Sequence, residues 1–378
     1  MKAAGIDVIS MSLGEPDMDT PEHIRRAAQE AIDKGWTHYG PVAGVPSLRE
    51  AIARSQNSHL RLDIGHLTFE ASDVIVSVGA KMAIYNAIQT VINPGDEVVI
   101  PMPSWVSYTE MVKVAGGKVV PVQTQYENRY CLTADELRAA LTEKTRTLIL
   151  CSPNNPTGSV YSHSQLEALV EVLRAYPEVT VLSDEIYNAL AYECLELSVE
   201  SFEIASPSMA LFPELAERLI IVNGVSKAYA MTGWRIGWLM SKNKAFIEAC
   251  TRLQGQQVTC ATMVAQKAAE AALTGSQDCV EQMRQVFAER RELICKLAAE
   301  IPGWKFEKPQ GAFYLFPDVS ALGGGDKIAE YLLEEAHVAV VSGSAFGCPE
   351  CIRLSYAIST EEIVEAMRRI KVAIEKLK

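Results

Sequence analysis

The sequence predicts an α/β fold with a largely parallel sheet between helices, followed by a second and smaller α+β domain. Between residues 73 and 222, apolar runs of strand length alternate with longer segments of helical composition. This alternation is typical of parallel sheets that carry helices on both faces. The regularity ends after residue 273, although strands and helices are still expected beyond it. A chain of 378 residues is also long enough for two domains, or for one large domain with an appendage.

Each element of the first part follows from an apolar run or from helix-capping residues. A short strand is expected within 5–13, and Thr20 followed by Pro21 indicates a helix that runs to about Lys34. Residues 39–46 are expected to form a rigid, turn-rich loop. Further strands are expected at 73–78, 97–100, 146–151, 179–182 and 219–222, and helices at 79–91, 107–115, 133–141 and 164–176.

The second part begins with a proline-free amphipathic segment. It predicts one long helix from Lys242 to about Leu273 that connects the two domains. Helices are then expected at 278–300 and 360–377, and strands near 305 and at 313–316, 338–341 and 352–356.

Composition excludes several classes of partner. The net charge of −12 argues against a nucleic-acid surface, and no apolar run approaches the length of a membrane span. We therefore expect small-molecule partners, with no nucleic acid and no membrane. Nine scattered cysteines indicate free thiols in a reducing compartment. Cys348 and Cys351 have the spacing of a redox or zinc motif, but no second pair accompanies them, so two loop thiols are the favoured interpretation.

Lys227 is the most informative single residue. It lies between two apolar runs, 219–223 and 236–240, where a charged ammonium is costly unless it is paired or neutral. A buried lysine with a lowered pKa is a nucleophile that forms Schiff bases, whereas a lone lysine at a strand end more often extends to water. Ser226 and Arg235 are the right residue types to hold a phosphate beside it.

Other polar residues also follow predicted strands, and ligands of open parallel sheets bind beyond the carboxyl ends of the strands. Gly79 and Ala80 offer free amides at a helix start, and Lys81 there is either a surface lysine or a residue held over a bound anion. Asp184 closes an apolar strand and either caps a helix or pairs with a protonated ring nitrogen. Tyr187, one helical turn later, can face the same space.

Two further residues have open interpretations. Trp105, in a proline-flanked loop, is either a core aromatic or a plate that stacks on a planar ring. Arg353 enters a late strand and could pair with any acid, but its fork fits a carboxylate best.

Taken in order, these motifs resemble the class I pyridoxal-phosphate-dependent aminotransferases of fold type I, in the bacterial and plastid aspartate (or aspartate/prephenate) aminotransferase subgroup. The likeness covers nearly the whole chain. It rests on SLGEPD (12–17), YGPVAGVP (39–46), GAK (79–81), PSWVSY (103–108), SPNNPTG (152–158), SDEIY (183–187), SKAYAMTGWR (226–235) and CIRLSY (351–356). The resemblance implies a large cofactor-binding domain at 19–265 with a mostly parallel seven-stranded sheet, and a small domain made of 1–18 and 266–378.

The resemblance also implies a role for each site residue. Lys227 would bind pyridoxal 5′-phosphate as a Schiff base and move the α-proton of the substrate. Asp184 would pair with the ring nitrogen, Tyr187 and Asn155 would bind the ring oxygen, and Trp105 would stack on the ring.

The remaining roles concern the phosphate and the substrate. Ser226, Arg235 and the amides of Gly79 and Ala80 would hold the phosphate, helped by Tyr39 from the other subunit of a homodimer with shared active sites. Arg353, with Asn155 and the Gly14 backbone, would bind the α-carboxylate, and Lys81 would bind the distal carboxylate of acidic substrates.

The implied activity is ping-pong transamination between aspartate or glutamate and a 2-oxo acid, in the cytoplasm, or in an organellar stroma if a transit segment has been removed. A prephenate or aromatic aminotransferase and a carbon–sulfur lyase remain alternatives on the same scaffold. A DNA-binding regulator is disfavoured by the net charge. The resemblance also implies an N-terminal segment that packs on the partner, which is expected to be absent here, and it assigns no role to the unusually long segment 188–218.

Overall fold

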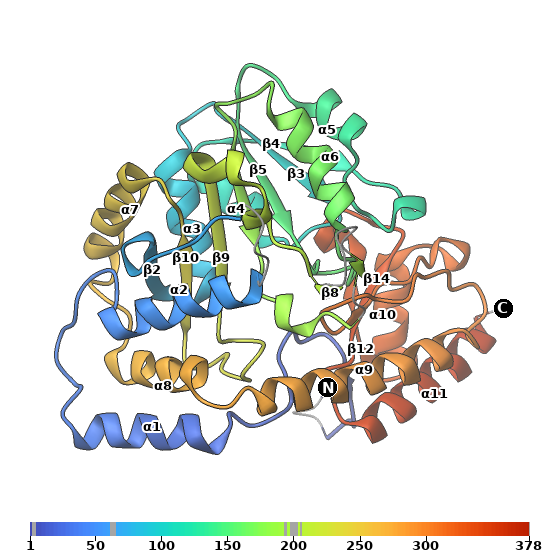
Figure 1. Ribbon diagram of the computed structural model, residues 1–378. Helices are drawn as coiled ribbons and strands as arrows, with labels where there is room; N and C mark the ends of the chain where they lie inside the picture. Colours follow the sequence, from blue (N-terminus) through green and yellow to red (C-terminus); the bar gives the residue numbers. More distant parts are fainter. Residues whose placement is uncertain (2–4, 61–65, 193–194, 197–202, 205, 378) are drawn as a thin grey trace.

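The computed structural model describes residues 1, 5–60, 66–192, 195–196, 203–204 and 206–377 (Figure 1). At its centre lies a seven-stranded sheet in the order β2-β10-β9-β6-β5-β3-β4. Only β10 runs against the others. These strands are β2 (Val74–Val78), β3 (Glu97–Met102), β4 (Lys118–Gln123), β5 (Thr145–Cys151), β6 (Thr180–Asp184), β9 (Leu219–Gly224) and β10 (Ile236–Met240). The predicted fold class, with its mostly parallel seven-stranded sheet, is confirmed.

Helices cover both faces of this sheet. Alternate strand residues point to opposite sides, so Val181 and Ile221 belong to one hydrophobic cluster while Leu182 and Ile220 belong to the other. The first cluster is covered by α1 (Glu22–Asp33), α2 (Pro46–Leu60), α5 (Ala134–Ala140), α6 (His163–Leu173) and α8 (Met263–Thr274). The second is covered by α3 (Gly79–Val91), α4 (Ser107–Val114) and α7 (Lys244–Gln257).

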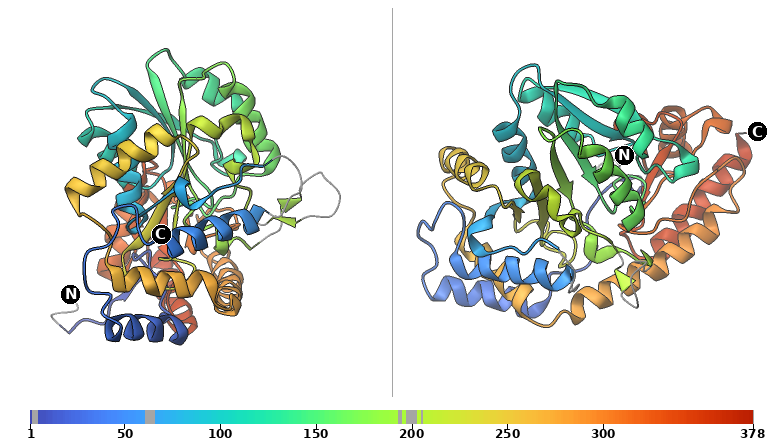
Figure 2. Two further views of the ribbon diagram at one scale, coloured as in Figure 1. Left: turned by 60° about the vertical axis from the view of Figure 1, so that its left-hand side comes forward. Right: turned by 45° about the horizontal axis from the view of Figure 1, so that its top comes forward.

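The last part of the chain lies at one side of the molecule (Figure 2, right), where a separate hydrophobic cluster holds its elements together. It joins Ile9 and Met11, near the start of the chain, to residues between Met283 and Ile374. Its elements are β1 (Ile9–Ser10), α9 (Asp278–Ala298), β11 (Tyr314–Leu315), α10 (Gly325–Glu335), β12 (Val338–Ala339), β13 (Val341–Ser342), β14 (Ile352–Ser355) and α11 (Thr360–Lys376). The limits of the two domains at residues 19 and 266 stay a prediction.

The long helix predicted from Lys242 to Leu273 is wrong, because the segment forms two helices, α7 and α8. Thr259 between them has a φ of +62°, a left-handed conformation that ends a helix. The connection between the two hydrophobic regions is made by α9 instead. Cys279 and Val280 at its start pack on the cluster of the large sheet, and Met283 onward packs on the second cluster.

Three further expectations need correction. The strand predicted near 305 is a single bridge between Lys305 and Asp318, and the one predicted at 338–341 is two short strands, β12 and β13. Helix α2 and strand β4 were not predicted. Pro46, which indicated a loop, is the first residue of α2, and β4 is a partly exposed edge strand without a buried apolar run.

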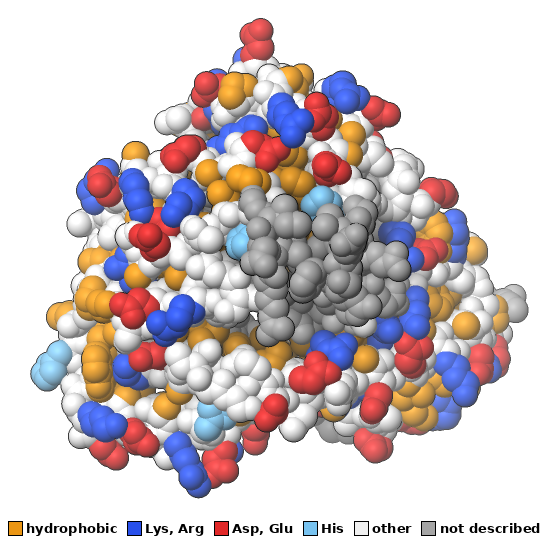
Figure 3. Space-filling view, in the orientation of Figure 1, with side chains coloured by type: hydrophobic (Ala, Val, Ile, Leu, Met, Phe, Trp, Pro, Cys, Tyr) orange, Lys and Arg blue, Asp and Glu red, His pale blue; other side chains and the backbone are white. Residues whose placement is uncertain are grey.

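The segment 188–218 lies partly outside the described residues. Its described elements are η4 (Asn188–Leu190), β7 (Leu195–Glu196), β8 (Glu203–Ile204), η5 (Met209–Leu211) and η6 (Pro213–Arg218). In the view of Figure 3, acidic and basic side chains are interspersed over the described surface. Among the described residues, no helix has the length and apolar composition needed to cross a membrane.

Candidate active site

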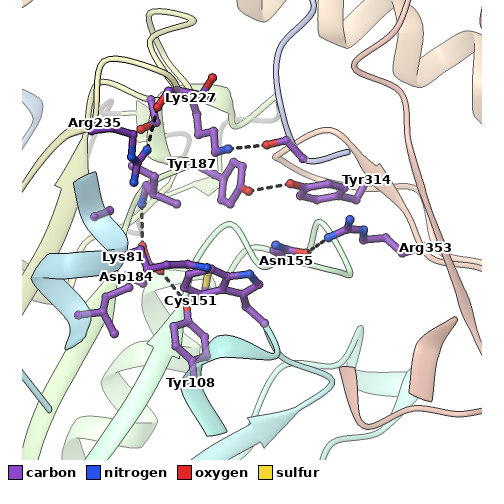
Figure 4. Close-up of a pocket in the computed structure, with 17 residues that line it drawn as sticks. Lys81, Tyr108, Cys151, Asn155, Asp184, Tyr187, Lys227, Arg235, Tyr314 and Arg353 are labelled. Atoms are coloured by element: carbon purple, nitrogen blue, oxygen red, sulfur yellow. Dashed lines mark hydrogen bonds between the residues drawn. The ribbon is translucent and has the colours of Figure 1, made fainter. Parts of the chain in front are cut away.

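A pocket of about 310 Å³ opens where the carboxyl ends of the parallel strands meet (Figure 4). Because β10 is antiparallel, its first residues reach the same edge. Eleven of the predicted site residues line this pocket: Gly14, Ala80, Lys81, Trp105, Asn155, Asp184, Tyr187, Ser226, Lys227, Arg235 and Arg353. The structure thus brings together residues that are separated by up to 339 positions in the chain (353 − 14).

Lys227 follows β9 and points its amine into the pocket. Its Nζ donates a hydrogen bond to the backbone oxygen of Gly14 at 2.5 Å. Burial lowers the pKa of this amine to about 8. The negative charge of Glu15 raises this pKa, and the positive charge of Arg235 lowers it. The amine is therefore a better nucleophile at neutral pH than an ordinary lysine.

Asp184 is the last residue of β6 and is only 3% exposed. Tyr108 donates a hydrogen bond to its Oδ2 at 2.6 Å, and the amide of Ile186 donates to Oδ1 at 3.2 Å. Burial nevertheless raises the pKa of this carboxyl to about 6. A cation beside it would hold the carboxylate ionised, and the pocket that Asp184 lines offers space for one.

No helix begins at Glu185, and the 3₁₀ helix η4 that follows at Asn188 has Tyr187 as its cap, so the interpretation of Asp184 as a helix cap is wrong. The chain turns instead, and the amide of Asn188 donates to the Glu185 oxygen at 3.0 Å. Tyr187 was expected one helical turn beyond Asp184, but it reaches the same pocket through this turn. Its hydroxyl oxygen lies 2.7 Å from that of Tyr314.

Two glycines allow the start of α3 to approach the start of β10 closely. A Cβ on Gly79, whose φ is +79°, would lie 2.2 Å from Nη2 of Arg235, and a Cβ on Gly237 would lie 2.3 Å from the amide nitrogen of Ala80. Gly79 itself does not line the pocket. Because it has no side chain, the guanidinium of Arg235 can lie beside the free amides at the start of α3. Ser226 is buried next to Lys227 at the same edge. This combination of donors is suited to a phosphate.

Trp105 faces the pocket from the loop that follows β3. It packs edge-on against Tyr108, with ring centroids 5.3 Å apart. Lys81 lies on α3 with its Nζ 4.7 Å from the centre of the Trp105 ring, and its side chain is exposed. The indole is thus only partly a core residue, because it packs on the hydrophobic cluster while it also lines the pocket.

Arg353 enters the pocket from β14 and is 7% exposed. Its two terminal nitrogens donate to Oδ1 of Asn155 at 2.8 Å and to the backbone oxygen of Ser12 at 2.7 Å. The guanidinium carbon lies 4.5 Å from the centre of the Tyr314 ring. Its Nε is buried and has no hydrogen-bond partner among the described residues. A guanidinium that is held this firmly, with donor capacity left over, is suited to a carboxylate ligand.

Tyr39 does not line this pocket. It is 89% exposed on the loop before α2, so its predicted contact with the site of a partner subunit stays a prediction. Sequence reasoning missed Tyr108 and Tyr314. Tyr108 lies three residues after Trp105 at a helix start, a spacing that could have indicated a shared face, whereas Tyr314 lies in an apolar run without any distinguishing signal.

Comparisons with known proteins agree with this site. Residues 6–370 match the family described as aminotransferase class I and II. The aspartate aminotransferase of Bacillus sp. (strain YM-2) is 43% identical over 98% of this chain and 92% of its own length. A probable aspartate/prephenate aminotransferase of Rhizobium leguminosarum bv. phaseoli is 42% identical over 98% and 92%.

Solved structures give the same result. The crystal structure of the aspartate aminotransferase from Rhizobium meliloti is 39% identical, with a TM-score of 0.92 over 99% of this chain and 93% of that one. The Thermus thermophilus aspartate aminotransferase with maleate is 38% identical, with a TM-score of 0.89 over 98% and 93%. The chain therefore belongs to the aminotransferase class I and II family.

Proposed function

We propose that this chain is an aspartate aminotransferase, which moves an amino group between aspartate or glutamate and a 2-oxo acid with pyridoxal 5′-phosphate as its cofactor. One observation carries the proposal. A single pocket holds the amine of Lys227, with its lowered pKa, together with a buried acid, the guanidinium of Arg235 and two further cations. These two, Arg353 and Lys81, approach the pocket from opposite sides (Figure 4). Two separated cations suit a substrate with two carboxylates.

The residues present fit the phosphate of the cofactor. Arg235, Ser226 and the amides of Gly79 and Ala80 would hold it at the start of α3. The close packing of the Arg235 guanidinium on the Gly79 backbone, which a Cβ on Gly79 would block, supports this assignment. A helix N-terminus adds the favourable field of its dipole to these donors.

The residues around the ring also fit. Asp184 would accept a hydrogen bond from the protonated ring nitrogen, and the raised pKa of its carboxyl indicates a need for such a cation. Tyr187 and Asn155 would donate to the ring oxygen, and Trp105 would cover one face. When bound, the cofactor supplies an electron sink for charge that develops on the substrate α-carbon.

The substrate contacts come from both parts of the chain. Arg353 would bind the α-carboxylate through its fork, with Asn155 and the Gly14 backbone beside it. Lys81, exposed at the pocket mouth, would bind the distal carboxylate. Binding at two points fixes the α-carbon in position and orientation relative to Lys227, which is where proximity contributes to the rate.

Lys227 would move the proton. Covalent exchange at this residue predicts ping-pong kinetics. Once its Nζ is free, the amine would take the proton from the α-carbon of the amino donor and hold it on Nζ. A base with a pKa near the working pH is the most efficient for this step, and a pKa of about 8 meets that condition.

The proposal includes a homodimer, in which Tyr39 of each chain reaches the phosphate site of the other. It is supported by the 89% exposure of Tyr39 and by the exposure of Leu13 near the pocket. A cytoplasmic location is also proposed. The eight cysteines of the described residues are all free thiols, which is typical of a reducing compartment.

A prephenate or aromatic aminotransferase is the second candidate. It is supported by relatives of the aspartate/prephenate type and by the exposed position of Lys81, which leaves the pocket mouth open to larger substrates. A carbon–sulfur lyase would need the same cofactor residues, so chemistry on the substrate must distinguish it.

The test is to load the purified protein with pyridoxal phosphate and titrate it with aspartate, glutamate, phenylalanine, arogenate and cystathionine in separate samples. We expect aspartate and glutamate to change the cofactor absorbance to that of the pyridoxamine form, with stoichiometric oxaloacetate from aspartate. Conversion by aromatic amines alone would favour the second candidate. Pyruvate and a thiol from cystathionine would indicate a lyase, and no conversion by any amine would refute the proposal.

A further inference from the structure

Tyr314 occupies a central position in the pocket to which no role has been assigned above. It belongs to β11, its side chain is fully buried, and it lines the pocket. Its hydroxyl oxygen is 2.7 Å from that of Tyr187, and its ring lies under the guanidinium of Arg353 at 4.5 Å. Its Oη would also be 2.5 Å from a Cβ on Gly14, so the glycine backbone packs directly against it.

These three neighbours belong to different parts of the proposed site. Tyr187 lies on the cofactor side, and Arg353 lies on the side of the substrate α-carboxylate. The backbone oxygen of Gly14 accepts the hydrogen bond from Lys227 Nζ. One side chain therefore contacts all three groups, and a displacement of its ring would reach each of them.

The hydroxyl needs its own explanation, because a phenylalanine ring would pack under Arg353 equally well. A buried hydroxyl is unfavourable unless it is hydrogen-bonded. Tyr187 is the one hydrogen-bond partner recorded for Tyr314 Oη in the described part of the chain. A phenol carries one donor and can also accept. If the hydroxyl of Tyr187 donates its hydrogen bond to the cofactor, it can only accept a hydrogen bond from Tyr314.

We propose that Tyr314 is a positioning residue: its hydroxyl donates to Tyr187 and directs that phenol toward the cofactor, while its ring supports Arg353. This inference rests on the proposed function. Hydrogen bonds in a chain polarise one another, so the donation from Tyr314 makes Tyr187 a stronger donor. A stronger hydrogen bond to the ring oxygen draws negative charge away from the adjacent Lys227 nitrogen, which then holds its proton less tightly.

The test compares Tyr314→Phe with Tyr356→Phe in the cofactor-loaded enzyme. Tyr356 is a matched control: it is fully buried in the same hydrophobic cluster, its hydroxyl donates to the Ala312 oxygen at 3.3 Å, and it does not line the pocket. The readout is the pH midpoint of the cofactor absorbance, which reports the proton on Lys227. Tyr314→Phe should raise this midpoint by roughly 0.5 pH unit, and Tyr356→Phe should leave it unchanged.

A double variant separates positioning from packing. In a Tyr187→Phe background, Tyr314→Phe should produce no further shift, because the hydrogen bond through which it acts is already lost. Thermal unfolding of the apoproteins should show comparable losses of stability for Tyr314→Phe and Tyr356→Phe.

Three results would overturn the inference: an unchanged midpoint in Tyr314→Phe, an equal shift in Tyr356→Phe, or additive shifts in the double variant. If any of them occurs while the wild type transaminates aspartate, the proposed function stands and only the role of Tyr314 fails. A cofactor-loaded wild type that no amine converts would refute the proposed function and the inference together.

Discussion

Replacing Lys81 by methionine tests the basis of substrate choice. The change removes the charge and keeps most of the length of the side chain. The Lys81 amine lies 4.7 Å from the Trp105 ring centre and is exposed at the mouth of the pocket. A hydrogen bond to a charged group contributes about 1.5–3 kcal/mol. Because solvent screens an exposed pair, the lower half of that range applies here.

The expected cost is therefore a roughly 10- to 40-fold loss in kcat/KM for aspartate, since about 1.4 kcal/mol corresponds to a factor of ten. The charge of the distal carboxylate does not change during the reaction, so the substrate and the transition state lose the interaction equally. We expect the loss in the KM for aspartate, with kcat nearly unchanged. The KM for phenylalanine, which has no distal carboxylate, should change by less than about threefold.

The assay is steady-state transamination of aspartate and of phenylalanine at low and high salt. Lys113→Met is the matched control, because Lys113 is an exposed lysine on α4 that pairs with Glu110 outside the pocket. The aspartate KM of the wild type should rise with salt more steeply than that of Lys81→Met. Equal losses for aspartate and phenylalanine, or a loss confined to kcat, would refute the role given to Lys81.

Three further predictions concern the cofactor lysine, the packing of the phosphate site and a buried acid beside Asp184. Lys227→Ala should lower the rate of oxaloacetate formation from aspartate by at least about 100-fold, and a normal rate would contradict the assignment. Gly79→Ala places a Cβ 2.2 Å from Arg235 Nη2, so the affinity of the apoprotein for pyridoxal phosphate should fall about tenfold or more. Gly233→Ala is the control, because its new Cβ would have no atom within 4 Å, and it should bind pyridoxal phosphate with normal affinity. Equal affinities of the two variants would show that the packing of Gly79 on Arg235 does not matter for cofactor binding. Burial raises the pKa of Glu185 to about 7 from 4.5, so the native state binds more protons than the unfolded state between these values and stability falls as pH rises through them. In urea unfolding of the apoprotein, Glu185→Gln should therefore lose less stability than the wild type between pH 5 and pH 8, and equal losses would show that Glu185 does not titrate in this way.

The strands of the large sheet could be predicted because they are buried on both faces and read as continuous apolar runs, as at Leu219–Gly224. Edge strand β4 reads KVVPVQ, and the proline within this partly exposed run argues against a central strand. The break after α7 depends on the conformation of Thr259 rather than on a proline or glycine signal, so amphipathic periodicity alone gave one helix where there are two.

Some residues of the site could likewise be predicted from a local pattern, whereas others could not. Asp184 and Lys227 stood out because charged residues closed apolar runs. The meeting of Arg353 with Asn155 depends on how the second part of the chain packs on the first, which no local pattern encodes. Tyr314 was missed because a buried tyrosine in a strand looks like any core aromatic until its hydroxyl partner is known.

The central claim is that Lys227 is the residue that holds the cofactor. Borohydride reduces the carbon–nitrogen double bond of a Schiff base to a stable single bond, so the pyridoxyl group stays attached to its lysine and peptide mass spectrometry can locate it. The structure predicts one pyridoxyl group per chain, on Lys227, and none in a sample that was converted with aspartate before reduction. A label on Lys81 or another lysine, or a label on Lys227 that aspartate does not remove, would contradict the account.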